Sequence, residues 1–101
     1  DEAHALGVLG RRGFGIAEQL GIDPNAVDIW MGTLSKTLSG AGGYIAGSAA
    51  LVEYIKTSVG AFVFSVGLSP PAAAASRAAL YIMLRKPERV TRLHANVRRF
   101  L

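Results

Sequence analysis

The stretch Gly32-Thr33-Leu34-Ser35-Lys36 directly follows the apolar run Val27-Asp28-Ile29-Trp30-Met31. The apolar run predicts a strand, and the small and hydroxyl-bearing residues after it predict a tight turn that holds Lys36 at the strand end. The nearest charged residues along the chain are Asp28 and Glu53, so Lys36 is not part of a charged helix face. An amine that is rigidly held and partly buried is a good nucleophile and suits Schiff-base chemistry. We therefore expect a chemical role for Lys36.

An acid and a histidine open the sequence, in Asp1-Glu2-Ala3-His4, and we expect them at a strand end. Residues 7–15 follow, with four glycines among nine residues. Such a segment predicts a loop whose backbone can approach another group closely. A short helical turn over residues 16–20 is then expected before the strand. Asp1 and His4 are thereby predicted to lie at the mouth of the glycine loop.

Strands and helices alternate downstream of Lys36. A short strand is predicted over residues 43–47, followed by a helix over residues 49–58 with Ser48 as its N-cap and Gly60 as its end. Residues 61–66 are rich in β-branched and aromatic side chains, which predicts a buried strand.

Two more helices are predicted toward the end of the sequence. Ser69-Pro70-Pro71 opens the first, because proline is tolerated in a first helical turn, and residues 72–84 continue it. Pro87 interrupts the chain, and the last segment has apolar residues at helical spacing, namely Val90, Leu93, Val97, Phe100 and Leu101. The alternation of strands and helices predicts an α/β layered architecture.

The composition limits the class of protein. Half of the 101 residues are hydrophobic and 18% are charged, which is not typical of a disordered chain. The sequence begins inside a motif and ends inside a helical pattern, so we expect it to be a piece of a longer polypeptide. No apolar run approaches the roughly 20 residues of a membrane span, and we expect no signal peptide. The absence of cysteine excludes disulfides and thiolate metal sites, so no metal site is expected and a cytoplasmic location is favoured.

The net charge of +4 raises the question of nucleic-acid binding. Eight of the eleven basic residues lie in two places, Arg11-Arg12 and the tail from Arg85 to Arg99. The spacing in the tail is that of a solvated helix face, so a nucleic-acid partner is not expected.

One chemistry uses an acid, a histidine and a lysine of this kind together. Active-site residues of open α/β sheets gather at the carboxyl ends of strands, so Asp1, His4 and Lys36 can converge although they lie about 35 residues apart. A pyridoxal phosphate cofactor needs a lysine for its imine, a carboxylate that keeps the ring nitrogen protonated, and hydroxyl or amide donors for its phosphate.

The sequence resembles the α-oxoamine synthases, which are fold-type-I pyridoxal-phosphate-dependent enzymes. The resemblance covers essentially the whole chain and rests on motifs in the family's order: Asp1-Glu2-Ala3-His4 with Gly7-Val8-Leu9-Gly10, Gly32-Thr33-Leu34-Ser35-Lys36, Gly42-Gly43-Tyr44-Ile45-Ala46-Gly47-Ser48, and Phe62-Val63-Phe64-Ser65 with Pro70-Pro71. It implies a segment of the large, cofactor-binding domain of the aspartate-aminotransferase-like α/β sandwich over residues 1–87. Residues 88–101 would be a helix leading into the small C-terminal domain.

Carried over by position, the resemblance implies a role for five residues. Lys36 would form the imine with the cofactor, Asp1 would pair with the pyridinium nitrogen, and His4 would hydrogen-bond the phenolic oxygen. Thr33 would reach the phosphate, and Ser65 would contact that phosphate from the partner subunit of a homodimer. The match is looser around Ser65, because the family often has threonine at the next position and has leucine directly before the two prolines.

The resemblance further implies the reaction. The parent enzyme would condense an amino acid with an acyl thioester, acyl-coenzyme A or an acyl-carrier protein, and release carbon dioxide to give an α-amino ketone. The segment alone is expected to be inactive. An aminotransferase or lyase of the same fold would share Lys36 and Asp1, and a non-catalytic relative would keep only the fold.

Two other interpretations of the motifs are open. Asp-Glu-Ala-His is also a signature of nucleotide-hydrolysing helicases, but these need a Gly-Lys-Ser/Thr phosphate loop that the sequence lacks. Taken singly, Asp1 would be a solvated residue, His4 a structural histidine, and Thr33, Ser35 and Ser39 ordinary turn formers.

Overall fold

A β-hairpin lies at the centre of the molecule. The computed structural model describes residues 1–101, and in it β1 (Ile29–Thr33) pairs antiparallel with β2 (Gly43–Gly47). The register places Gly32 opposite Tyr44 and Thr33 opposite Gly43. Both strands were predicted, although β1 begins two residues later than the apolar run. The loop of residues 34–42 joins the strands and carries Lys36, as the sequence predicted.

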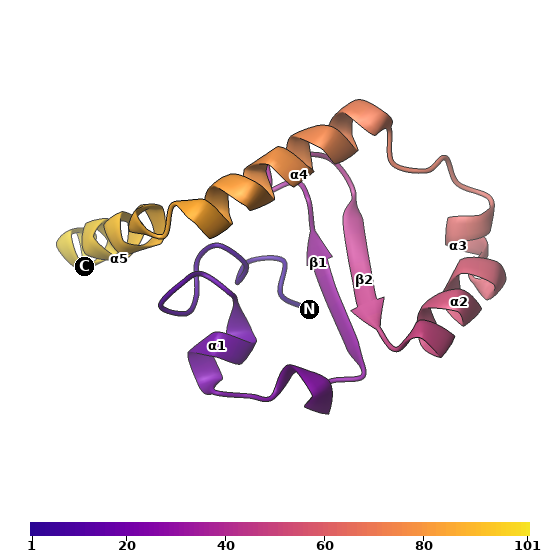
Figure 1. The fold of residues 1–101 in the computed structure, drawn as a ribbon, viewed down its shortest axis with the longest axis horizontal. Helices are drawn as coiled ribbons and strands as arrows, with labels where there is room; N and C mark the ends of the chain where they lie inside the picture. The colour runs from indigo at the N-terminus through magenta and orange to yellow at the C-terminus, as the bar shows by residue number, and fades with distance from the viewer.

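The N-terminal segment lies beside β1 (Figure 1). The backbone amide of Glu2 donates to the carbonyl oxygen of Met31 at 2.8 Å, which fixes the first residues against the strand. Residues 3–5 form a turn and the two-stranded sheet does not include residues 1–4, so the expected position of Asp1 and His4 at a strand end stays a prediction. The glycine loop closes on itself through an isolated bridge between Leu6 and Phe14.

Short helices follow the glycine loop and flank the hairpin. The helix α1 (Ile16–Leu20) confirms the predicted helical turn, and the 3₁₀ turn η1 (Pro24–Ala26) leads into β1. On the β2 side lies α2 (Ala49–Ser58), whose first turn is capped by Ser48, since the Ser48 hydroxyl accepts from the amide of Leu51 at 3.3 Å. This helix and its cap were predicted, but Gly60 does not end it.

The segment over residues 61–66 is not a strand, so that prediction is wrong. Residues Gly60–Val63 form the helix α3, in which the amide of Phe64 donates to the carbonyl oxygen of Gly60 at 3.0 Å. The side chains of Phe64 and Val66 are 90% and 97% exposed. β-Branched and aromatic residues indicate that a segment is apolar but do not by themselves determine its backbone conformation. No strand lies beside residues 61–66 to form backbone hydrogen bonds with them.

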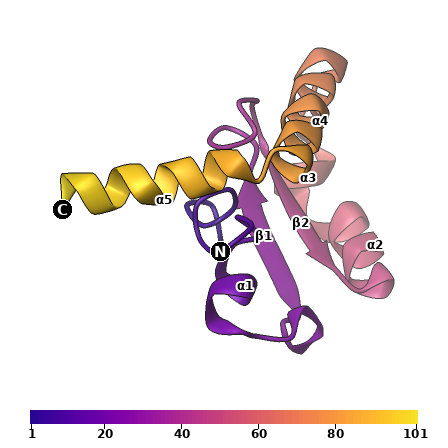
Figure 2. The same cartoon turned by 60° about the vertical axis from the view of Figure 1, so that its left-hand side comes forward.

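Two long helices complete the chain. The first, α4 (Pro70–Arg85), crosses the end of the hairpin where the Lys36 loop lies, and α5 (Glu88–Phe100) projects away from it (Figures 1 and 2). Both were predicted, including the prolines in the first turn of α4. No helix is both long and apolar enough to cross a bilayer.

The buried core is small and lies beneath the loops. Ala5, Leu38, Met83 and Val90 are the buried apolar side chains, and they belong to the N-terminal turn, the Lys36 loop, α4 and α5. Many other large apolar side chains remain exposed, among them Ile29, Met31 and Ile45 of the hairpin. The best-packed part of this chain is therefore the part that supports the Lys36 loop.

Candidate functional site

The Lys36 loop is held by its own backbone and by one buried side chain. The amide of Gly40 donates to the carbonyl oxygen of Leu34 at 2.7 Å, and the amide of Ser39 donates to that of Lys36 at 2.9 Å. The side chain of Leu38, two residues after the lysine, is only 5% exposed and anchors the loop. Ser39 has φ of 52°, a left-handed conformation typical of a tight turn.

The amine of Lys36 has no hydrogen-bond or ion-pair partner in the chain. The residue is exposed, so the partial burial expected from its sequence context is not found here. The sequence correctly placed the lysine in a fixed loop but overestimated how much of this chain covers it. A rigid backbone with an uncommitted amine is nevertheless the arrangement that a covalent partner requires.

Thr33 closes the base of the loop. Its hydroxyl donates to the carbonyl oxygen of Gly42 at 3.2 Å and lies 2.7 Å from the hydroxyl of Ser35, whose amide also donates to it. The single hydroxyl proton of Thr33 is therefore used within the loop, as expected of a turn former. A phosphate contact would require that proton to turn away from Gly42, so the phosphate role of Thr33 stays a prediction.

Asp1 and His4 line one cavity of about 380 Å³. One carboxylate oxygen of Asp1 accepts from the amide of Ala3 at 2.8 Å, which closes a turn and orients the carboxylate. His4 is exposed and its ring makes no hydrogen bond within the chain. The other lining residues are Glu2, Ala3, Ala5, Leu9 and Ile16. The structure thus brings the predicted acid and histidine together and leaves their reactive atoms accessible.

Contacts that the sequence did not predict tie this cavity to the hairpin and the lysine loop. The hydroxyl of Thr37, next to Lys36, donates to the carbonyl oxygen of Leu6 at 2.8 Å. The phenol of Tyr44 on β2 donates to the Glu2 carboxylate at 3.1 Å. The only sequence signals were that Thr37 directly follows Lys36 and that Tyr44 lies inside the quoted motif of residues 42–48.

Two pKa shifts accompany these contacts. Burial raises the pKa of Tyr44 to about 12, and the hydrogen bond to Glu2 and its negative charge act in the same direction. Desolvation raises the pKa of Glu18, but hydrogen bonds from the amide of Phe14 and from Arg12 outweigh it and leave the pKa lowered. The Glu18 carboxylate thereby acts as a charged acceptor that braces the glycine loop.

Ser65 lies apart from the other predicted residues. It follows α3, and its hydroxyl donates to the carbonyl oxygen of Phe62 at 3.1 Å. The residue is exposed, and nothing within one chain brings it to Lys36 or Asp1. Its expected role belongs to a second subunit, so its contact with the cofactor phosphate stays a prediction.

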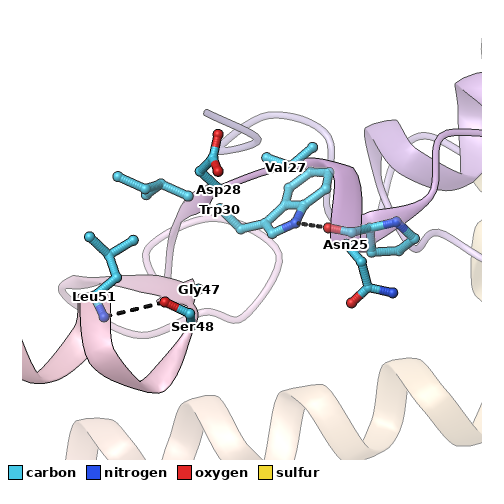
Figure 3. Close-up of a pocket in the computed structure, with 9 residues that line it drawn as sticks. Asn25, Val27, Asp28, Trp30, Gly47, Ser48 and Leu51 are labelled. Carbon is cyan, nitrogen blue, oxygen red and sulfur yellow. Dashed lines mark hydrogen bonds between the residues drawn. The ribbon is translucent and has the colours of Figure 1, made fainter.

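A larger cavity, of about 710 Å³, lies at the opposite end of the hairpin from the Lys36 loop (Figure 3). Two of its polar side chains are already paired, since the indole of Trp30 donates to the carbonyl oxygen of Pro24 at 3.0 Å and the Ser48 hydroxyl caps α2. None of the predicted site residues lines it. We therefore place the candidate site at the Asp1–His4 cavity and the Lys36 loop on chemistry rather than size.

Proteins of known family resemble this chain over nearly its whole length. The model of the aminotransferase class I and II family matches residues 1–101. The 8-amino-7-oxononanoate synthase of Anaeromyxobacter dehalogenans is 52% identical over 95 residues, which are 94% of this chain and 24% of that protein. This chain thus spans about a quarter of the length of such relatives.

Solved structures have the same fold. The serine palmitoyltransferase of Sphingomonas wittichii superimposes with a TM-score of 0.87 at 28% identity, over 98% of this chain and 25% of that one. A high-resolution structure of SPT with PLP gives a TM-score of 0.84 at 27% identity, over 95% of this chain and 24% of that one. The predicted α/β fold type is therefore confirmed, and the chain belongs to the aminotransferase class I and II family and, within it, to the α-oxoamine synthases.

Proposed function

We propose that this chain is part of the cofactor-binding domain of a pyridoxal-phosphate-dependent α-oxoamine synthase. The parent enzyme condenses an amino acid with an acyl thioester, carried by coenzyme A or by an acyl-carrier protein, and releases carbon dioxide to give an α-amino ketone. One observation carries the proposal. The Thr37–Leu6 hydrogen bond ties the loop of an uncommitted lysine to the segment that presents Asp1 and His4 in one cavity.

The residues present fit the cofactor. Lys36 has a free amine on a fixed loop, Asp1 offers a carboxylate oriented by the turn to Ala3, and His4 offers an unpaired ring. These are the three protein groups that pyridoxal phosphate uses for attachment, for its ring nitrogen and for its phenolic oxygen. Among relatives of the same fold, an SPT is known with PLP. Lys36, Asp1 and His4 would hold the cofactor, and Thr33 and a partner subunit's serine at the position of Ser65 would add donors for its phosphate.

The roles of the side chains follow from their chemistry. When bound, pyridoxal phosphate supplies an electron-withdrawing ring that stabilises negative charge on the substrate's α-carbon. The carboxylate of Asp1 holds a proton at the ring nitrogen through a charge-assisted hydrogen bond. His4 would donate to the phenolic oxygen, and the amine of Lys36 would move a proton at the substrate's α-carbon as a general base and acid.

The partners and location of the protein belong to the same proposal. The amino acid and the acyl thioester bind at the cavity of Asp1 and His4, and two copies of the chain assemble as a homodimer in which Ser65 of each serves the other's site. The enzyme acts in the cytoplasm. The exposure of Ser65 and of its neighbours Phe64 and Val66 supports a contact outside the single chain.

The reaction is tested with the full-length protein and pyridoxal phosphate. Carbon dioxide release from a panel of amino acids is measured with and without acyl-coenzyme A and acyl-carrier-protein thioesters. An α-oxoamine synthase releases carbon dioxide and free thiol in equal amounts, only when both substrates are present. Transfer of the amino group to a 2-oxo acid without thiol release would instead identify an aminotransferase, and carbon dioxide release without a thioester would identify a lyase.

A further inference from the structure

We infer that Glu2 and Tyr44 form a clamp that positions the Asp1–His4 turn for the cofactor, and that Gly32 is the residue that makes the clamp possible. The inference rests on the proposed function and adds two positioning residues to it. Neither side chain is assigned to the cofactor itself.

The clamp holds Glu2 from both strands of the hairpin. The backbone amide of Glu2 donates to Met31 of β1 at 2.8 Å, and the carboxylate of Glu2 accepts from the phenol of Tyr44 of β2 at 3.1 Å. Tyr44 lies 42 residues downstream of Glu2, so the contact is a long-range one. Glu2 lies between Asp1 and His4, and fixing it at two points limits how both neighbours can move.

The position of the Tyr44 ring depends on the absence of a side chain at Gly32. Tyr44 is paired with Gly32 across the hairpin, and its ring lies over that glycine. A Cβ atom at Gly32 would collide with the Cζ and Oη atoms of the Tyr44 ring. Gly32 has ordinary backbone angles, so its small size rather than its conformational freedom is what the position requires.

The carboxylate of Glu2 is enclosed from the other side as well. A Cβ atom at Gly15 would collide with Oε2 of Glu2, so the glycine loop packs directly on the carboxylate. One oxygen of Glu2 thus meets Tyr44 and the other meets the backbone of the loop. Glycine leaves room for the Glu2 carboxylate at position 15 and for the Tyr44 ring at position 32, which favours a specific contact over a chance surface hydrogen bond.

The phenol is suited to a permanent donor role. Burial and Glu2 raise the pKa of Tyr44 to about 12, so the range in which the phenol is protonated and can donate extends well above neutral pH. The clamp therefore acts as a fixed strut and not as a proton-transfer group. A loss of the strut should loosen Asp1 and His4 without removing either of them.

The test compares variants of the full-length protein. Tyr44→Phe removes the donor and keeps the ring, Glu2→Gln keeps a carbonyl acceptor for the phenol, and Tyr54→Phe is the matched control on an exposed tyrosine of α2 whose hydroxyl has no partner. Three measurements are made: amide hydrogen exchange of residues 1–9 without cofactor, the pH dependence of the bound cofactor's absorbance, and kcat and KM for the amino acid.

Tyr44→Phe is expected to speed the exchange of residues 1–9, to shift the pH at which the cofactor's absorbance changes, and to lower kcat about tenfold with little change in KM. Glu2→Gln should retain most of each wild-type property, and Tyr54→Phe should match the wild type. Gly32→Ala should also break the hydrogen bond between Tyr44 and Glu2, because the added methyl group displaces the Tyr44 ring while both partners are kept. It should therefore change exchange, absorbance and kcat in the same direction as Tyr44→Phe does.

Unchanged exchange and absorbance in Tyr44→Phe would overturn the clamp. Faster exchange with unchanged absorbance and kcat would show that the contact stabilises the segment without positioning Asp1 and His4 for the cofactor, and would also overturn the inference. Neither exchange nor absorbance depends on turnover. If the wild-type protein binds pyridoxal phosphate but releases no carbon dioxide, the proposed function therefore fails while these two measurements still decide the clamp.

Discussion

The hydroxyl of Thr37 donates to the carbonyl oxygen of Leu6 at 2.8 Å, and this bond joins the loop of Lys36 to the segment of His4. The methyl group of Thr37 lies against Gly7, where a Cβ atom would collide with it. Thr37 therefore contributes a hydrogen bond and a packing contact at one junction, and the two contributions can be separated by substitution.

Thr37→Val keeps the methyl contact and removes the donor, so we expect it to lower the free energy of unfolding by about 1 kcal/mol. Thr37→Ser keeps the donor and should retain most of the activity that Thr37→Val loses. Denaturant unfolding and kcat of the full-length protein provide the measurements. If the valine variant is the more active of the two, the hydrogen bond does not connect the two segments in the working enzyme.

Lys36→Ala should remove the covalent attachment of the cofactor and leave the fold intact, because Lys36 is exposed and its amine makes no hydrogen bond or ion pair in the chain. Borohydride reduction followed by mass spectrometry of the wild-type protein should find the adduct on Lys36. Circular dichroism of the variant should match that of the wild type. An adduct on Lys56 or Lys86 would refute the assignment.

Asp1→Asn should reduce activity far more than Glu2→Gln does. A neutral amide cannot hold the proton on the ring nitrogen, and loss of a charge-assisted hydrogen bond in a closed site costs about 3 kcal/mol of transition-state stabilisation. The Glu2→Gln change leaves an acceptor for Tyr44 and should act only through positioning. Steady-state kcat/KM of the two variants is the comparison, and equal losses would contradict the distinct roles.

The Tyr44 contact predicts a loss of stability at high pH. The folded-state pKa of Tyr44 is about 12, above the usual value of 10, so the folded protein holds this proton more tightly than the unfolded chain does. Its contribution is fully present below pH 10 and is lost as the pH rises toward 12. Unfolding of wild type and of Tyr44→Phe should therefore differ at neutral pH and converge over that range.

Residues 1–101 produced alone should not form the amino ketone. Few side chains are buried, and residues such as Phe64, Val66 and Phe100 are at least 90% exposed, so apolar surface is left for association. In the isolated segment Lys36, Asp1 and His4 would not hold the cofactor and substrate in a fixed orientation. Such orientation can lower an activation barrier by on the order of 7–11 kcal/mol. Amino-ketone formation above the rate of free pyridoxal phosphate would refute this, with the full-length protein as the positive control.

Local signals in the sequence predicted most of the secondary structure. The proline-led start of α4, the Ser48 cap and the apolar stripe of α5 each have a short-range physical cause, and each was found. The segment at residues 61–66 was misassigned because its apolar side chains indicate burial against something, whereas the backbone follows local hydrogen bonds that begin at Val59.

The sequence supplied the candidate site residues but not the contacts that join their segments. Asp1, His4 and Lys36 were identified from motifs, and Asp1 and His4 do line one cavity. The contacts of Thr37 with Leu6 and of Tyr44 with Glu2 span 31 and 42 residues, and no periodicity encodes contacts at such separation. The exposure of Lys36 was also unpredictable, since it depends on how much of the surrounding chain covers the loop.

The long-range hydrogen bonds of the N-terminal segment also affect the order in which its contacts form. The segment from Asp1 to Val8 precedes its partners along the chain, which are Thr37, Tyr44 and finally His94, whose ring nitrogen lies 2.7 Å from the carbonyl oxygen of Val8. Contacts of such sequence separation form slowly, because a long loop must close before they contribute. The acid and the histidine are therefore synthesised before the residues that fix their segment, and the contact of Val8 with His94 cannot form before α5 has emerged.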